Sequence, residues 1–370
     1  MSLINAALVL EENQSLAAHT TIALGGKARY FARCANADQI CEALSFARER
    51  QLSVFVLGGG SNVVFPDEGY PGLILNVNLR GISVYEGTPC AVTAAAGEIW
   101  DDFVHFCIDY NLGGIECLSG IPGLVGATPI QNVGAYGQEV AETIQKVTAI
   151  HCGTLETVEF SGEECKFGYR RSRFKNDDAD QYIITEVSFQ LPRYAMPNIR
   201  YPELERHVEA QGGLSALKPG QPALLAVRAA VLDLRRKKSM VLDPADPNSR
   251  SVGSFFMNPV LSKQEYERLV QRWQQTGSAE QIPMFPARDG IKVPAAWLVE
   301  HAGFPRGFRQ GGAGISFNHS LALVNYGGTT RELLALAEAI QRNVKERFGV
   351  ALEREPVVVN PQAHTYISPQ

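Results

Sequence analysis

The stretch CLSGIPGLVGATPIQNVGAYGQEV, residues 117–140, contains five glycines and two prolines and no charged residue before Glu139. This spacing of glycine and proline excludes one continuous helix or strand. The length of the stretch and its lack of charge argue against a solvated linker. Glycine allows close approach to a backbone, and the hydroxyl and amide side chains supply hydrogen-bond donors. The stretch therefore indicates a loop that lies against a ligand.

A second glycine cluster lies upstream, in LSVFVLGGGSNVVF at residues 52–65. An apolar strand is expected at Val54–Leu57, followed by a second at Leu73–Val77, and α/β folds commonly bind ligands where such strands end. Consecutive glycines leave backbone N–H groups free to surround an anion. The cluster is not GxGxxG and no acidic residue stands about 20 positions on, which disfavours a Rossmann site. Alone it could be a plain turn, but the two clusters together favour a long ligand carrying a diphosphate.

Composition narrows the class of protein. The chain has 370 residues, 45% of them hydrophobic, with a net charge of -5, which predicts two or three globular domains and excludes a disordered or coiled-coil protein. The negative charge supplies no general attraction to nucleic acid or anionic membrane, so neither is expected as a partner.

The scattered histidines predict no metal site. The seven cysteines form no CxxC pair and favour free thiols in a reducing cytosol. The N-terminus lacks a basic signal-peptide region, and no apolar run is long enough to span a bilayer. We therefore expect a cytoplasmic protein.

The hydrophobic pattern predicts both helices and strands. Helical spacing is expected at 37–50, 100–110, 262–275 and 329–348, and in a helix that begins near Ala223. Strands are expected at 91–96, 144–151 and 183–191. Proline and glycine interrupt the pattern between 192 and 222, which places a domain boundary there.

Five motifs in order carry a resemblance to a known family: LGGGSN (57–62), SGIPGLVGATPIQNVGAYG (119–137), GYRRSRFK (168–175), VGSFFMNP (252–259) and LEREP (352–356). From about His19 to Val359 the chain resembles the UDP-N-acetylenolpyruvoylglucosamine reductases, flavoenzymes of peptidoglycan precursor synthesis. The resemblance implies an α+β fold with a vanillyl-alcohol-oxidase-like FAD-binding domain of two subdomains, 1–85 and 86–222. A substrate-binding domain at 223–359 and a tail at 360–370 would follow.

The same resemblance implies that both glycine clusters hold FAD without a Rossmann motif. Gly58–Asn62 and Ser119–Gly126 would face its pyrophosphate and ribose, and the later residues its isoalloxazine ring. The residues implied to bind FAD are Gly58, Gly59, Gly60, Ser61, Asn62, Ser119, Gly120, Ile121, Pro122, Gly123, Gly126, Thr128, Gln131, Asn132, Gly134, Ala135, Tyr136 and Gly137.

The family's reaction passes a hydride from NADPH to flavin and then from flavin N5 to the enolpyruvyl group of a UDP-sugar. Hydride addition moves charge onto the carboxylate, which needs a cation and a proton donor. The resemblance implies that Ser254 donates the proton and that Arg170 stabilises the enolate. It also implies that the carboxyl of Glu355 helps to position or protonate the intermediate. From the residues alone, Ser254 reads as a turn serine, Arg171 and Arg173 compete with Arg170, and Glu353 competes with Glu355.

Four further residues match the substrate side of the family pattern: Tyr169, Tyr201, Lys238 and Asn258. Without the resemblance, Lys238 is simply a cation at a helix C-terminus. Met257 departs from the pattern, because some relatives carry lysine there. We expect a monomer.

Two alternatives stay open at this point. One is a sugar or alcohol oxidase on the same FAD fold, and the other is a non-catalytic nucleotide-binding protein.

Overall fold

A four-stranded sheet forms the first part of the chain. The computed structural model describes residues 8–87, 89–287 and 290–360 of the protein. In sheet order its strands are β1 (Leu10–Ser15), β2 (Lys27–Cys34), β5 (Tyr70–Val77) and β3 (Val54–Leu57). β2 and β3 both run parallel to β5, whereas β1 is antiparallel to β2. The first seven residues and the expected tail, apart from Asn360, lie outside the described residues.

Helix α1 (Ala37–Glu49) connects β2 to β3 and buries Ile40, Leu44 and Ala47, as its spacing predicts. Asn36 caps this helix, since its Oδ1 accepts a hydrogen bond from the backbone N–H of Gln39 at 2.9 Å. The glycine run at 58–60 follows β3, so it lies at the carboxyl end of a strand in a parallel pair.

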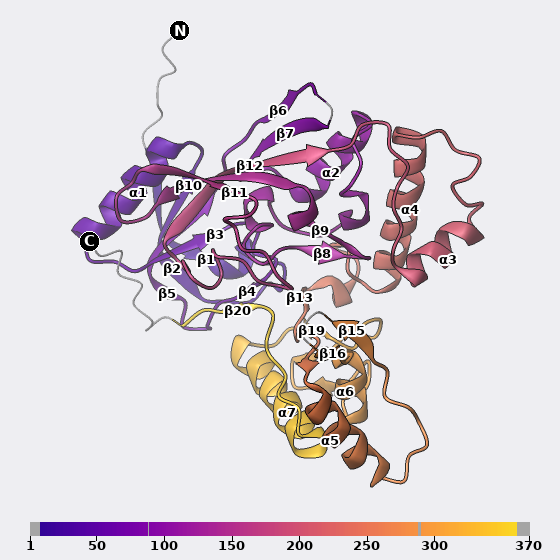
Figure 1. Cartoon of the computed structure of the whole chain (residues 1–370). Helices are drawn as coiled ribbons and strands as arrows, with labels where there is room; N and C mark the ends of the chain where they lie inside the picture. Colours follow the sequence, from indigo (N-terminus) through magenta and orange to yellow (C-terminus); the bar gives the residue numbers. More distant parts are fainter. Residues whose placement is uncertain (1–7, 88, 288–289, 361–370) are drawn as a thin grey trace.

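A five-stranded antiparallel sheet follows in the chain. In sheet order its strands are β11 (Thr157–Ser161), β10 (Ile144–His151), β12 (Tyr182–Leu191), β7 (Cys90–Ala95) and β6 (Ile82–Tyr85). Helix α2 (Trp100–Asp109) packs on it, with the rings of Phe103 and Phe189 4.9 Å apart. Residues of both sheets, α1 and α2 share one hydrophobic core, so the two sheets form one lobe (Figure 1).

Helices α3 (Pro202–Ala210) and α4 (Gln221–Lys237) lie at one end of this lobe (Figure 1). They pack on each other and on Cys117 through Leu204, Val227 and Val231. Helix α4 therefore contacts the larger lobe, although the sequence places nearly all of it in the last domain. The domain boundaries at 85/86 and 222/223 stay predictions.

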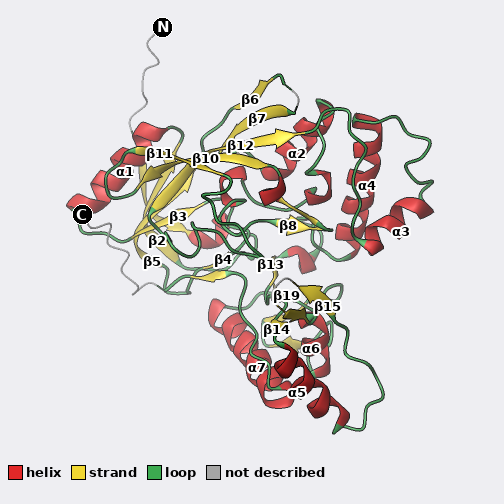
Figure 2. Cartoon of the chain, in the orientation of Figure 1, coloured by secondary structure: helices red, strands yellow, loops and turns green. Residues whose placement is uncertain are grey.

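The C-terminal lobe combines two small sheets with three helices (Figure 2). The strands are β13 (Ser251–Ser254), β19 (Ala322–Asn325), β18 (Ala313–Ile315) and β17 (Arg309–Gln310) in one sheet, and β14 (Val260–Leu261), β16 (Gly290–Lys292) and β15 (Phe285–Ala287) in the other. The helices are α5 (Lys263–Gln274), α6 (Ala295–His301) and α7 (Thr330–Phe348). Helix α7 ends at Gly349, whose φ of 73° is the left-handed conformation common after a helix.

The chain then returns to the larger lobe. β20 (Val357–Val358) pairs in parallel with β4 (Val63–Val64), and the backbone N–H of Val357 donates to the carbonyl of Asn62 at 3.0 Å. We call residues 353–359 the return strand. It connects the C-terminal lobe directly to the first glycine loop.

Shorter elements complete the described chain. These are β8 (Gly134–Ala135), β9 (Gln138–Glu139) and the 3-10 turns at Leu16–His19, Glu116–Leu118, Val125–Ala127, Val140–Glu142 and Pro247–Ser249. All seven cysteines are free, and six of them are buried. Within the described residues, no helix has both the length and the apolar character needed to cross a membrane.

Candidate functional site

The two glycine clusters lie against each other, as their common role predicts. A Cβ on Gly59 would come within 2.9 Å of the Cα of Gly123, so neither loop has room for a side chain there. The hydroxyl of Ser61 donates to the carbonyl of Pro122 at 3.0 Å. A Cβ on Gly126 would come 2.5 Å from the Cβ of Ala96. The result is a cradle of uncharged backbone.

Several of the predicted cofactor side chains are engaged within the protein. Ser119 and Thr128 are buried, and their hydroxyls donate to the carbonyls of Glu116 and Val125 at 2.7 and 2.8 Å. These hydroxyls stabilise the turns of the loop. Their contact with a cofactor stays a prediction.

Amide side chains tie the loops together. Asn62 donates through Nδ2 to Oε1 of Gln131 at 2.9 Å, linking the first glycine loop to the second. Nδ2 of Asn132 donates to Oε2 of Glu139 at 2.7 Å. The segment ends in the turn from β8 to β9, where Tyr136 and Gly137 have φ values of 48° and 83°.

The predicted substrate residues Tyr201 and Lys238 meet Tyr136. The rings of Tyr136 and Tyr201 are 5.5 Å apart, and Nζ of Lys238 lies 5.8 Å from the centre of the Tyr136 ring. Lys238 also forms an ion pair with Glu203 of α3, Nζ to Oε2, at 2.7 Å. Burial raises the pKa of Tyr136 to about 12, which keeps its phenol protonated. This brings the end of α4, the start of α3 and the turn after β8 to one place.

The predicted catalytic residues Arg170 and Glu355 form an ion pair. Nε of Arg170 lies 2.9 Å from Oε1 of Glu355, and the two side chains are 19% and 13% exposed. The pair is poorly aligned, because the buried Nε has no hydrogen-bond partner among the described residues. Nη2 of Arg170 donates to the carbonyl of Gly134 at 2.9 Å. The cation therefore bridges the return strand and the second glycine cluster.

The competing arginines and glutamate lie elsewhere. Arg173 forms an ion pair with Asp178 at 2.6 Å, and Arg171 is exposed. Glu353 is exposed as well, and it forms no ion pair with Arg170. These positions favour Arg170 and Glu355 over their neighbours, although their catalytic roles stay predictions.

A short backbone ladder connects the segment that follows Ser254 to the segment of Glu355. The N–H of Glu355 donates to the carbonyl of Phe255 at 2.9 Å, and Phe256 pairs with Arg354 in an antiparallel bridge. Ser254 follows Gly253, whose φ is 76°. The Ser254 side chain is part of a half-buried residue, and its hydroxyl makes no hydrogen bond within the described residues. That hydroxyl is therefore free to act on a ligand.

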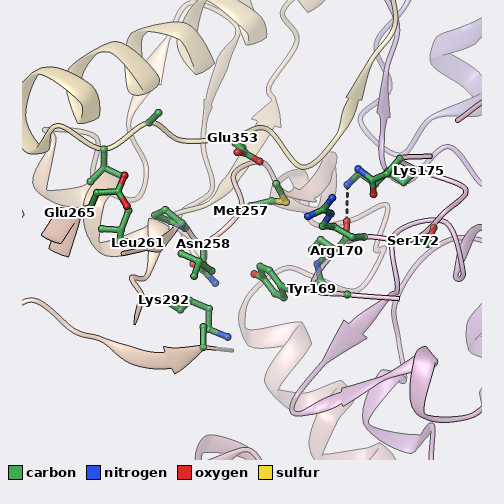
Figure 3. A pocket seen from close by; sticks show the side chains of 18 of the residues that line it. Tyr169, Arg170, Ser172, Lys175, Met257, Asn258, Leu261, Glu265, Lys292 and Glu353 are labelled. Atoms are coloured by element: carbon green, nitrogen blue, oxygen red, sulfur yellow. Dashed lines mark hydrogen bonds between the residues drawn. The ribbon is translucent and has the colours of Figure 1, made fainter. Parts of the chain in front are cut away.

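Tyr169 and Asn258, together with Arg170, line a cavity of about 1430 Å³ (Figure 3). Oδ1 of Asn258 accepts a hydrogen bond from the backbone N–H of Ala295 at 2.9 Å. Burial raises the pKa of the Tyr169 phenol, while Arg170 and hydrogen bonding to Asn258 oppose that rise. Ser254 and Glu355 do not line this cavity. Of the three predicted catalytic residues, only Arg170 therefore lines the cavity.

Two half-buried lysines near these residues were not predicted. Nζ of Lys175 donates to the carbonyl of Arg170 at 3.2 Å, and Nζ of Lys292 lies 5.2 Å from the centre of the Tyr169 ring. Burial lowers the pKa of Lys175, with Arg170 lowering it further against the effect of Glu355. Lys175 ends the quoted GYRRSRFK motif, so its position in that motif was an available signal.

Arg235 and His319 were also not predicted. Burial lowers the pKa of Arg235, whose Nη2 donates to the carbonyl of Met240 at 2.7 Å and whose buried Nε has no partner in the described chain. Burial, together with Lys238 and Arg235, lowers the pKa of His319 to about 4. Nδ1 of His319 accepts from the N–H of Leu321 at 3.1 Å, so the neutral ring carries its proton on Nε2.

The donor set fits a diphosphate dinucleotide such as FAD. The Cβ of Gly120 would lie 3.4 Å from Nε of Arg235, which places an unpartnered buried cation beside the glycine cradle. An anionic group would satisfy that Nε. No group of His, Cys, Asp and Glu suited to a metal ion occurs among the residues the structure describes.

Two family models match separate parts of the chain. Residues 28–159 match a family model described as an FAD binding domain. Residues 244–359 match the model described as UDP-N-acetylenolpyruvoylglucosamine reductase, C-terminal domain.

Curated relatives cover nearly the whole chain. The UDP-N-acetylenolpyruvoylglucosamine reductase of Thermobifida fusca is 45% identical over 94% of this chain and 97% of its own length. The enzyme of the same name from Mycobacterium tuberculosis is 41% identical over 95% of each chain.

A solved structure supports the fold. The crystal structure of UDP-N-acetylenolpyruvylglucosamine reductase (MurB) from Thermus caldophilus matches with a TM-score of 0.63 and 22% identity, over 96% of this chain and 99% of that one. The predicted α+β fold, an FAD-binding part followed by a C-terminal part, is thereby confirmed.

Proposed function

Because the chain belongs to the family of UDP-N-acetylenolpyruvoylglucosamine reductases, FAD-dependent oxidoreductases, we propose that it reduces the enolpyruvyl group of UDP-N-acetylglucosamine enolpyruvate to give UDP-N-acetylmuramate. The electrons come from NADPH through FAD. One observation carries the assignment of the reaction site. Arg170 and Glu355, far apart in sequence, form an ion pair beside the second glycine cluster, and the segment that follows Ser254 pairs through its backbone with the segment of Glu355.

FAD reduced by NADPH, held by the two glycine clusters, would supply a hydride to the terminal carbon of the enolpyruvyl double bond. Addition moves the electron pair toward the neighbouring carbon and its carboxylate. The guanidinium of Arg170 stabilises that charge, because its fixed fork of donors matches a carboxylate. Ser254 then donates the proton of its hydroxyl to the neighbouring carbon. The hydride and this proton together add two electrons and two protons across the double bond.

Glu355 has a supporting role in this proposal. Its carboxylate lies 2.9 Å from Nε of Arg170, so it holds the guanidinium toward the substrate carboxylate. The backbone of Glu355 is fixed from two sides, by Phe255 and by Nδ2 of Asn62 at 3.4 Å from its carbonyl. The first glycine loop and the C-terminal lobe together therefore fix the position of Glu355.

The UDP part of the substrate is assigned to the other side of the Tyr136 turn. Lys238 and the Nε2–H of His319 supply donors to its diphosphate, and Tyr201 packs on Tyr136 to cover it. NADPH carries a diphosphate as well, so the two substrates use this surface in turn. The lowered pKa of His319 keeps the ring a neutral donor at neutral pH.

The experiment is optical. Purified protein should be yellow, NADPH should bleach the flavin under anaerobic conditions, and UDP-N-acetylglucosamine enolpyruvate should restore the colour with UDP-N-acetylmuramate as the product by mass spectrometry. Equally rapid recovery with oxygen and no substrate would indicate an oxidase. Retained flavin that no nicotinamide nucleotide reduces would indicate a binding protein without this activity.

A further inference from the structure

The cavity on the Tyr169 side of Arg170 is strongly basic, which the overall charge of -5 does not suggest. It lies between residues 166–177 of the larger lobe and α5 with residues 348–353 of the C-terminal lobe. We call it the basic cleft (Figure 3). Eight Lys and Arg side chains line it against three Asp and Glu side chains, which leaves a surplus of five positive charges.

Most of these cations have no carboxylate partner, although Lys175 and Arg272 each donate to a backbone carbonyl. Lys166, Arg170 and Arg173 form ion pairs with Asp177, Glu355 and Asp178. The other five cations form no ion pair within the described ranges 8–87, 89–287 and 290–360; they are Arg171, Lys175, Arg268, Arg272 and Lys292. Like charges around one cavity repel each other, and an anion inside it would relieve that repulsion.

The basic cleft adjoins the proposed reaction site and extends beyond it. Tyr169, Arg170 and Asn258 line it and form the wall that the two sites share. Ser254, Glu355, Lys238 and the glycine loops do not line it. The UDP-binding surface proposed above therefore does not account for Arg171, Arg268 and Arg272.

We propose that the basic cleft binds a small anion with a phosphate or diphosphate group, held between Arg171 on one lobe and Arg268 and Arg272 on the other. All three arginines are exposed at the mouth, where guanidinium groups can contact phosphate oxygens in pairs. The volume of about 1430 Å³ exceeds that of ordinary ligand pockets, so a nucleoside diphosphate fits as well as a free diphosphate.

The position of Lys175 gives such an anion an effect on the enzyme. Lys175 lines the cleft and donates to the carbonyl of Arg170, a residue whose φ of 54° is left-handed. An anion that draws Nζ of Lys175 into the cleft would release that carbonyl. The site would thereby couple anion binding to the position of the Arg170 backbone.

Calorimetric titration of the flavin-loaded full chain with inorganic pyrophosphate tests the site. We expect the Arg268→Glu, Arg272→Glu double variant to weaken pyrophosphate binding by at least about tenfold, the loss expected for one charge-assisted contact. Arg171→Glu, on the opposite wall, should weaken it similarly and serves if the double variant does not fold. Arg342→Glu, an exposed residue of α7 that does not line the cleft, is the matched control and should bind as the unmodified chain does.

Separate arms identify the ligand class and the independence of the site. Titration with ADP, pyrophosphate and adenosine distinguishes a nucleotide from free diphosphate, because only a nucleotide site gains affinity from the base. With saturating UDP-N-acetylglucosamine present to occupy the diphosphate surface at Lys238, pyrophosphate should still bind to the cleft, and Lys238→Ala should leave this remaining binding unchanged. Loss of that binding when the UDP-sugar is present, an equal loss in Lys238→Ala, or no binding of pyrophosphate at all would overturn the proposal. These binding measurements do not require the proposed reaction to occur.

Discussion

Replacing Ser254 with alanine tests the assignment of the proton donor most directly. In the structure the Ser254 hydroxyl makes no hydrogen bond within the described residues, so its removal breaks no internal contact. We expect the free energy of unfolding to change by no more than about 0.5 kcal/mol, as for a surface substitution. A large change in rate would then reflect chemistry and not folding.

The size of that change follows from the role. General acid catalysis contributes typically about 10²- to 10⁴-fold, which corresponds to about 2.7–5.4 kcal/mol of transition-state stabilisation. Only the second half-reaction needs this proton. Reduction of the flavin by NADPH should therefore proceed at the unmodified rate, while reoxidation by the enolpyruvyl substrate slows by that factor.

Anaerobic stopped-flow absorbance separates the two half-reactions. Ser251→Ala is the matched control, because Ser251 lies on the same strand, is buried, and accepts a hydrogen bond from the N–H of Gly253 at 3.3 Å. That control should lose about 1 kcal/mol of stability and keep its reoxidation rate. Reoxidation at the unmodified rate in Ser254→Ala would show that another group supplies the proton.

Three further outcomes follow from the charged residues. Lys175→Met should slow flavin reoxidation about tenfold by freeing the Arg170 backbone while leaving flavin reduction unchanged. Lys175→Arg should restore part of the reoxidation rate. An equal loss of rate in both half-reactions would contradict a positioning role for Lys175. Burial raises the pKa of Asp101, but its hydrogen bonds with Arg228 and Gly120 outweigh this and lower it. The stability from that lowered pKa is present above the ordinary pKa of about 4 and is lost below it, so the difference in melting temperature between the unmodified chain and Asp101→Asn should shrink in acid. The pKa of His319 is lowered to about 4, so the unfolded chain takes up a proton before the folded one as the pH falls. Stability therefore falls between about pH 6.5 and 4. His319→Gln should flatten that part of the profile of melting temperature against pH, and an unchanged slope would contradict this role of His319.

Elements with a strong local pattern were predictable. The strand expected at 144–151 is β10, and the helix expected from Trp100 is α2, because apolar periodicity alone defines them. Helix α3 was missed, since it begins at Pro202 inside a region rich in proline and glycine and has nine residues. Helix α6 has seven residues, too few for periodicity to distinguish it from a buried strand.

The site was predictable only where a motif carried it. Arg170 and Glu355 are 185 positions apart in sequence, and no local pattern predicts that they pair. The lowered pKa values of Arg235 and His319 come mainly from burial, to which Lys238 and Arg235 add at His319. These surroundings arise only in the folded chain. For Ser119 and Thr128 the sequence predicted hydroxyl donors, but not that backbone carbonyls of the same loop accept their hydrogen bonds.

The pairing of β20 with β4 constrains the order in which the protein can mature. During synthesis β4 leaves the ribosome roughly 290 residues before its partner strand, a delay of about 15–60 s at about 5–20 residues per second. Until then the backbone of Asn62 lacks the N–H of Val357, and Glu355 does not yet exist. The first glycine loop is therefore synthesised early but completed late. Productive binding of the flavin must await release of nearly the whole chain from the ribosome. A prematurely terminated product that lacks only the return strand should be deficient in both flavin and activity.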